Sequence, residues 1–212
     1  MGQRGHAKSR GLCFFYNGKG NEIHQLGIGL FVHHRIISSF MRAELVSDRM
    51  SDVVLRGRWC NIIVFKVHAS REEKSDDSKE SFYAVLEQVF NDFPNYHMTI
   101  MLGYFNPKVG REYIFRLTIQ NESLHQDSND NGIRIVNFTT SKNLDVKSMI
   151  LPHQNIHTYT WTFPDGQTHN QIDHILIDRR WHSSVLYVRS FRVADCDTDY
   201  YLVIEKVREG WQ

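Results

Sequence analysis

The stretch Asn61-Ile62-Ile63-Val64-Phe65-Lys66-Val67 carries the strongest structural signal in the sequence. Its apolar run is nearly continuous, as in a strand that other elements cover on both faces. The link Arg56-Gly57-Arg58 separates the expected strand Trp59–Val67 from the expected strand Asp52–Arg56, which predicts a hairpin. Residues 52–67 therefore predict the interior of a β-sheet.

Strand-like segments also dominate the rest of the chain. They are Leu26–His34, Arg42–Val46, His97–Phe105, Thr158–Phe163, Gln171–Ile177, Ser184–Phe191 and Tyr201–Val207. Two helices are expected, one where apolar residues recur at helical spacing from Phe82 to Phe93 and one from Asn131 to Lys142. The polar segments Ser70–Glu80 and Gly110–Asp130 are expected to be loops. With many strands, few helices and no internal repeat, the pattern predicts an α+β fold, a two-sheet β-sandwich flanked by helices.

Length, charge and cysteine content narrow the class of protein. The 212 residues predict a single domain over residues 1–212, with 1–20 irregular and 205–212 as a tail. Lys and Arg together number 25 and Asp and Glu together number 24. The resulting formal net charge of +1 excludes a polybasic tail or a strongly basic nucleic-acid-binding protein. Three widely spaced cysteines favour a reducing, intracellular compartment, either nuclear or cytoplasmic. No apolar stretch approaches the roughly 20 residues that cross a bilayer, so no membrane partner is expected.

Polar side chains stand where several expected strands end, which is where scaffolds place reactive groups. His68 follows the strand Trp59–Val67, Asn106 follows His97–Phe105, Asp173 lies within Gln171–Ile177, and Asp199 precedes the last strand. Each also has a purely structural explanation. The pair Asn106-Pro107 is a common turn start, and Asp199 belongs to an acidic stretch that solvent alone would satisfy.

The order of these segments resembles the endonuclease/exonuclease/phosphatase superfamily, whose members share a DNase I-like four-layer α/β sandwich. The resemblance is strongest to the endonuclease domain of non-LTR retrotransposons and to the craniofacial development protein 2-like proteins of vertebrates. It runs nearly from end to end. The segments that carry it are Phe31–Ser38, Val67-His68-Ala69, Leu102–Gly110, Tyr159-Thr160-Trp161, His169–Ile177 and Asp197–Val203.

The resemblance implies a DNA endonuclease that hydrolyses phosphodiesters with Mg²⁺ as cofactor and DNA as partner. It implies that Asn106 hydrogen-bonds a phosphate oxygen and that Asp173 orients a catalytic histidine. His68 matches a position that is often Tyr in this fold. By the same resemblance Asp199 is a weak candidate for a metal ligand, and Trp161 is a candidate for substrate binding together with Asn106.

The chain departs from the family pattern at three places. The central Gly-Asp-Phe-Asn motif reads Gly103-Tyr104-Phe105-Asn106, so a phenol that is neutral at pH 7 stands in place of a carboxylate. The C-terminal Asp-His motif reads Asp199-Tyr200, which removes the usual partner of Asp173. The family's early Asn and its metal-binding Glu are not found, so the first strand is expected to be missing.

These departures predict a catalytically dead or crippled nuclease with impaired Mg²⁺ binding and weak DNA binding. General acid or base catalysis is typically worth about 10²–10⁴ in rate, and two such groups are replaced. The alternative is a non-catalytic interaction or nucleic-acid-binding module of the same fold. Arg56-Gly57-Arg58 and Arg179-Arg180 are local basic clusters that favour it, although a solvated hairpin and a strand end explain them equally well. A third possibility is an unstable chain without a selected function, because a lost strand exposes a sheet edge.

Overall fold

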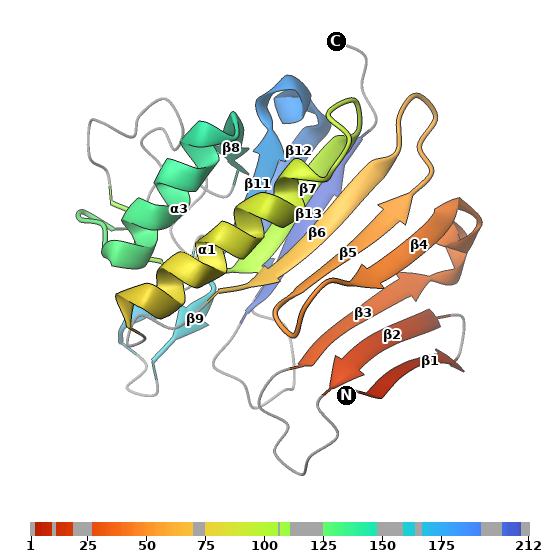
Figure 1. The fold of residues 1–212 in the computed structure, drawn as a ribbon, viewed down its shortest axis with the longest axis horizontal. Coiled ribbons are helices and arrows are strands. Elements are labelled where there is room, and N and C mark those ends of the chain that lie inside the picture. The colour runs from red at the N-terminus through yellow and green to blue at the C-terminus, as the bar shows by residue number, and fades with distance from the viewer. Residues whose placement is uncertain are drawn as a thin grey trace.

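A six-stranded sheet forms the centre of the molecule (Figure 1). The computed structural model describes residues 3–9, 12–18, 27–69, 75–105, 107–110, 125–147, 159–163, 167–191 and 201–208, and only the backbone of 3–9, 12–18 and 27–31. In spatial order the strands of the central sheet are β4 (Phe40–Leu45), β5 (Met50–Leu55), β6 (Ile62–His68), β7 (Met98–Tyr104), β11 (Asp173–Asp178) and β8 (Leu144–Val146).

Strands β6 and β7 are parallel neighbours near the middle of this sheet, and the other pairs are antiparallel. Helix α1 (Asp76–Asn91) makes the crossover between them. Along β6, Ile63, Phe65 and Val67 are fully buried, while Lys66 and His68 point to the opposite face and are half-buried. The predicted strand is therefore confirmed over residues 62–67, and so is its hairpin with the preceding strand, whereas 59–61 belong to the loop between the two strands.

Two helices, α1 and α3 (Asp130–Ser141), cover one face of the sheet. Their inward side chains meet those of the sheet in one large apolar core. Its fully buried members include Phe65, Leu86, Met101, Ile135 and Leu176. Helix α1 begins at Asp76, inside the expected loop at 70–80, because Asp76 and Asp77 suit a helix N-terminus, where the unpaired N–H groups favour negative charge.

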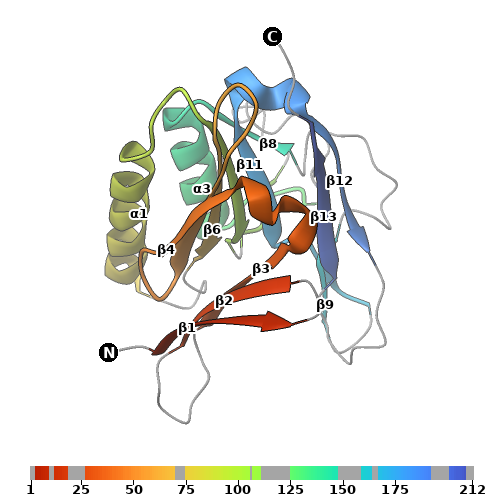
Figure 2. The ribbon, with the colours of Figure 1, turned by 90° about the vertical axis from the view of Figure 1, so that its right-hand side faces the viewer.

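A two-stranded sheet covers the other face. It consists of β12 (Val185–Phe191) and β13 (Leu202–Val207), and a second apolar core lies between it and β7 and β11. Figure 2 shows the resulting layers, with α1 and α3 on one side of the central sheet and β12 and β13 on the other. The expected α+β sandwich with flanking helices is confirmed.

Short elements complete the described part of the chain. They are β1 (Gln3–Ser9), β2 (Leu12–Gly18), β3 (Gly27–His33), β9 (Trp161–Thr162), β10 (His169–Asn170) and the 3-10 helices η1 (His34–Ser39) and η4 (Arg179–Ser184).

The expectation of an irregular segment over residues 1–20 is wrong for 3–9 and 12–18, which pair as an antiparallel hairpin. The expected tail at 205–212 is wrong for residues 205–207, which belong to β13. Within the described ranges, no helix is long and apolar enough to cross a membrane.

Candidate functional site

Three of the predicted site residues form a row across the central sheet. His68 ends β6, Tyr104 ends β7 and Asp173 begins β11. The strand register pairs His68 with Tyr104, and Tyr104 with Asp173. Residues paired in register share a face of the sheet, so this His68–Tyr104–Asp173 row presents an imidazole, a phenol and a carboxyl group side by side.

The imidazole and phenol of the row are in contact. The ring centroids of His68 and Tyr104 lie 5.1 Å apart, with the rings nearly perpendicular at 88°. This edge-to-face arrangement is favourable for two aromatic rings and holds both side chains in place. An aromatic ring therefore occupies the middle of the row, between His68 and Asp173.

The carboxyl group of the row is poorly solvated, and Asp173 as a whole is half-buried. Burial raises the pKa of Asp173 to about 6, while a hydrogen bond with Thr160 and the nearby charge of Lys66 act in the opposite direction. The hydroxyl oxygen of Thr160 also accepts hydrogen bonds from the backbone N–H groups of Ile172 and Asp173, at 3.1 and 3.2 Å. Thr160 thus fixes the start of β11 and the orientation of the Asp173 carboxyl group.

Lys66 is a site residue that sequence reasoning missed. It lies two residues before His68 on the same face of β6. Burial lowers the pKa of Lys66, and the charge of Asp173 counteracts part of that shift. The available signal was a single charged residue within the apolar run Ile62–Val67. Each charge favours the ionised form of the other, so the two groups form a weakly solvated pair between the sheets.

An aromatic and polar cluster flanks the row on the side of β9 and β10. The ring of Tyr159 stacks on that of His169, with centroids 4.3 Å apart. The hydroxyl groups of Thr162 and Tyr201 are hydrogen-bonded at 2.8 Å, and the N–H of Tyr201 donates to the Thr160 carbonyl oxygen at 2.9 Å. The chain that immediately follows the Asp199-Tyr200 motif is therefore anchored beside Asp173.

Of the four remaining predicted residues, the structure describes Trp161. Trp161 is half-buried in β9, one residue after Thr160, and its ring meets that of Phe163 edge-on at 5.6 Å. Its role in substrate binding stays a prediction. Asn106, Asp199 and Tyr200 lie outside the described residues.

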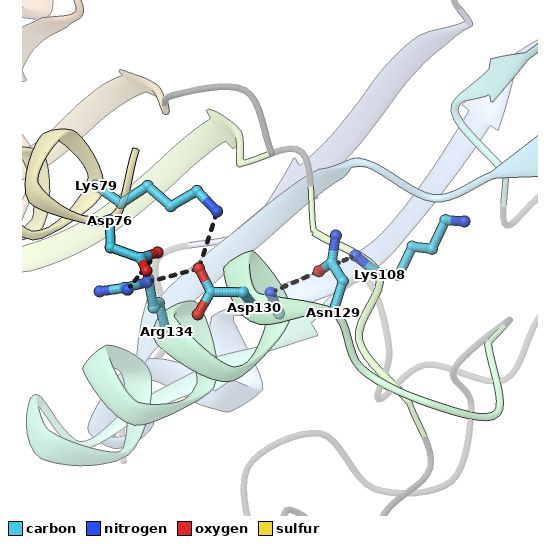
Figure 3. Close-up of polar contacts among 7 residues, drawn as sticks. Asp76, Lys79, Lys108, Asn129, Asp130 and Arg134 are labelled. Atoms are coloured by element: carbon cyan, nitrogen blue, oxygen red, sulfur yellow. Dashed lines mark hydrogen bonds and ion pairs between the residues drawn. The ribbon is translucent and has the colours of Figure 1, made fainter. Parts of the chain in front are cut away.

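The segment after the Gly103-Tyr104-Phe105-Asn106 motif is held by the start of α3 (Figure 3). The side-chain oxygen of Asn129 accepts hydrogen bonds from the N–H groups of Lys108 and Gly132, at 2.9 and 2.8 Å. The N–H of Asn129 in turn donates to the Lys108 carbonyl oxygen at 2.9 Å. A Cβ atom at Gly132 would lie 2.1 Å from that carbonyl oxygen, so only glycine permits this approach.

Charged side chains on the two helices reinforce this anchor. The carboxylate of Asp130 accepts from the ammonium of Lys79 at 3.0 Å and from the guanidinium of Arg134 at 2.9 Å. These hydrogen bonds lower the pKa of Asp130. Figure 3 shows Lys79 reaching from α1 and Arg134 from within α3 toward the same carboxylate. The anchor therefore links α1, α3 and the segment that follows β7.

The glycine of the central motif has a steric role. A Cβ atom at Gly103 would lie 2.6 Å from the ring of Phe105 and 2.9 Å from the Val67 carbonyl oxygen. Because Phe105 is fully buried, its ring has no space to move aside. Gly103 thus allows β6, β7 and the Phe105 ring to pack closely directly beneath the row.

The donor set of the row does not suit magnesium. Mg²⁺ is bound by carboxylate oxygens and water in octahedral geometry. Among the residues that the structure describes, no group of three or more His, Cys, Asp and Glu side chains could hold a metal ion. The row itself offers one carboxyl group, whose pKa is raised to about 6 and whose near neighbour is the cationic Lys66. These residues therefore do not fit the cofactor that the family resemblance implies.

Comparison with known proteins agrees with the fold and with the sequence resemblance. The chain is 30% identical over 188 residues to Craniofacial development protein 2 of Bos taurus and to that of Tragulus javanicus, covering 86% of this chain. It spans only about 30% of the length of these curated relatives. No family model matches the chain.

Solved structures with the same fold include a retrotransposon endonuclease domain and a DNA 3′ phosphatase. The endonuclease domain of TRAS1, a telomere-specific non-LTR retrotransposon, superposes with a TM-score of 0.63 at 12% identity, over 95% of this chain and 82% of that domain. The 3′ phosphatase NExo from Neisseria, bound to a product DNA hairpin, gives 0.64 at 18% identity over 94% and 80%. The chain thus has the DNase I-like fold of the endonuclease/exonuclease/phosphatase superfamily, and its sequence is similar to Craniofacial development protein 2 over most of its own length.

Proposed function

We propose that this chain is a nucleic-acid-binding domain with the nuclease-like fold that does not hydrolyse phosphodiesters. The observation that carries the proposal is Tyr104, whose ring stands in register between His68 and Asp173. In the family pattern, this position supplies the carboxylate that positions or activates the attacking water. A phenol at the same position has no carboxylate oxygen to bind a cation and is a poor proton acceptor near neutral pH.

The electrostatics around Tyr104 support the same proposal. Asp173 is the row's only carboxyl group, and burial raises its pKa to about 6. The nearby Lys66 adds a positive charge that disfavours a divalent cation. The local charge is therefore less favourable to Mg²⁺ than that of a site built from several carboxylates.

A plasmid assay tests the loss of cleavage. Supercoiled plasmid would be incubated with the chain in the presence of Mg²⁺ or Mn²⁺, beside its Asp173→Ala variant. Neither protein is expected to nick the plasmid above the background of buffer alone. Metal-dependent nicking by the parent chain that disappears in Asp173→Ala would show that a working catalytic site assembles and would refute this part of the proposal.

Nucleic-acid binding is proposed for a separate reason. One neighbour of the same fold was solved with a product DNA hairpin and another with a single-strand DNA product. With a net charge of +1 the chain should bind weakly, and because phosphate contacts release counterions, its affinity should fall as salt rises. Fluorescence anisotropy with labelled oligonucleotides at 50 mM and 200 mM salt measures both properties, and the absence of binding at the lower concentration would contradict the proposal.

A further inference from the structure

The end of the sandwich opposite the His68–Tyr104–Asp173 row gathers arginine and aromatic side chains. Three segments meet there: the loop 56–61 between β5 and β6, the segment 94–97 before β7, and η4 after β11. All three lie along the upper edge in Figure 1 and again in Figure 2. Since β6 has seven residues, this end lies roughly 20 Å from the row.

Hydrogen bonds tie these three segments to one another. The N–H of Asn61 donates to the imidazole of His97 at 3.2 Å, and the N–H of Met98 donates to the Asn61 carbonyl oxygen at 3.1 Å. The guanidinium of Arg180 in η4 donates to the carbonyl oxygen of Asn95. These contacts make a defined surface from residues that lie more than a hundred positions apart in sequence.

The surface is cationic although the whole chain is nearly neutral. Its arginines are Arg56, Arg58, Arg179, Arg180 and Arg208, the last placed there by the hydrogen bond from its N–H to the carbonyl oxygen of Ser184 in η4. Asp145 pairs with Arg179 and Asp178 pairs with Arg180, and Asp92 lies at the end of α1. Arginine therefore outnumbers aspartate, and Arg56, Arg58 and Arg208 are exposed.

Two aromatic side chains are exposed on the same surface. Trp59 is 53% exposed and Tyr96 is 69% exposed, which is unusual for residues of this size. The guanidinium of Arg58 lies 5.1 Å from the centre of the Trp59 ring. The ring of Tyr96 rests against that of His97, with centroids 4.1 Å apart. Both aromatic rings are thus held at the surface, and that of Trp59 lies against a positive charge.

We infer that this Arg58–Trp59–Tyr96 surface binds single-stranded nucleic acid. Guanidinium groups bind phosphate, and exposed aromatic rings stack on unpaired bases, which is how single strands are held without sequence preference. An acidic peptide would use the arginines but would gain nothing from the rings. The inference names a site for the binding part of the proposed function, and it does not depend on whether the row at the other end cleaves.

The test compares the parent chain with a double variant, Arg58→Gln with Trp59→Ala, in anisotropy titrations of a labelled twenty-nucleotide oligo(dT). The variant is expected to bind at least tenfold more weakly at 50 mM salt. The slope of log affinity against log salt should become shallower by about 0.7 for the lost charge. Trp59→Phe alone should keep binding within threefold of the parent, because phenylalanine still stacks.

A matched control separates this surface from general loss of charge and apolar area. Arg42→Gln with Met41→Ala removes one exposed arginine and one exposed apolar neighbour from β4. This control should bind within twofold of the parent chain. Circular dichroism should show that all variants unfold as cooperatively as the parent chain, so that a loss of affinity reports the surface rather than the fold.

The remaining outcomes are distinct from one another. Binding by the parent that Asp173→Ala abolishes and the Arg58–Trp59 variant leaves intact would overturn the inference while retaining the proposed function. The absence of any oligonucleotide binding would refute both. Equal affinity for polyaspartate and for oligo(dT), or for anionic phosphatidylserine vesicles, would show that the surface recognises charge alone and would also overturn the inference.

Discussion

At the scale of single residues, two half-buried titratable side chains distinguish the space between the two sheets. Lys66 and Glu205 both point into it, Lys66 from β6 and Glu205 from β13, on the side of Val203 and Val207. The alternation of each strand predicts which residues share a face, but it does not say what covers that face. His68, Tyr104 and Asp173 were predicted because they belong to recognisable motifs, whereas Lys66 and Glu205 stand in stretches without one.

Glu205 makes stability depend on pH. Burial raises its pKa from 4.5 to about 7, and its Oε1 atom has no hydrogen-bond partner in the described part of the molecule. The unfolded chain ionises this group first as pH rises above 4.5, so its contribution to stability falls until the pH passes about 7. Glu205→Gln should therefore raise the free energy of unfolding by roughly 2 kcal/mol at pH 8 and change it little at pH 5.

Urea unfolding at the two pH values measures this difference. The control is Glu80→Gln, an exposed position on α1, which should have the same small effect at both. A Glu205→Gln variant that gains no stability at pH 8 relative to pH 5 would mean that water reaches the Glu205 carboxyl group in solution.

At the scale of elements, apolar periodicity succeeded where a segment packs on one or both faces and failed where it does not. The strand over residues 62–67 and the helix over residues 82–91 were both predicted from their buried residues. The first turn of α1 was missed because Asp76 and Asp77 are exposed and carry no apolar signal. The hairpin of β1 and β2 was missed because Gln3–Ser9 is polar. Its strands pair through backbone groups, and amino-acid composition does not reveal such pairing.

The start of α3 is the element boundary with the largest expected effect on the site. Asn129→Ala removes the side chain that caps the helix and accepts from Lys108, so the free energy of unfolding should fall by about 1–2 kcal/mol. Chemical unfolding followed by circular dichroism measures the loss. Asn137→Ala on the exposed face of the same helix is the control and should change stability by less than 0.5 kcal/mol, roughly the usual range at surface positions. Equal effects of the two substitutions would contradict the anchoring role of Asn129.

At the scale of the whole molecule, charge is distributed unevenly between the two ends of the sandwich. The net charge of +1 is correct for the sequence but hides the arginines gathered around η4 and the loop 56–61. Sequence showed Arg56-Gly57-Arg58 and Arg179-Arg180 as separate clusters, and only the antiparallel pairing of β11 with β7 brings them to one end. The overall composition could exclude a strongly basic protein but could not detect a local cationic surface.

Divalent metal should have little effect on the stability of the folded chain. A ligand raises the melting temperature only when it binds the native state more tightly than the unfolded chain. Since the row's donors do not suit magnesium, 5 mM Mg²⁺ should shift the melting temperature by less than about 1 °C relative to buffer with EDTA. Differential scanning fluorimetry measures the shift, and a rise of several degrees would show that a specific metal site exists.

The register of β6, β7 and β11 also bears on how this chain could change over evolutionary time. Tyrosine and aspartate codons differ at one base, so a single mutation at position 104 replaces the phenol by a carboxylate. The strand pairing that aligns this position with His68 and Asp173 runs through backbone groups, which such a mutation leaves in place. The sheet therefore keeps the positions of these three residues whatever side chain stands at position 104. The arrangement of the row and its chemical groups can be inherited, lost or regained separately.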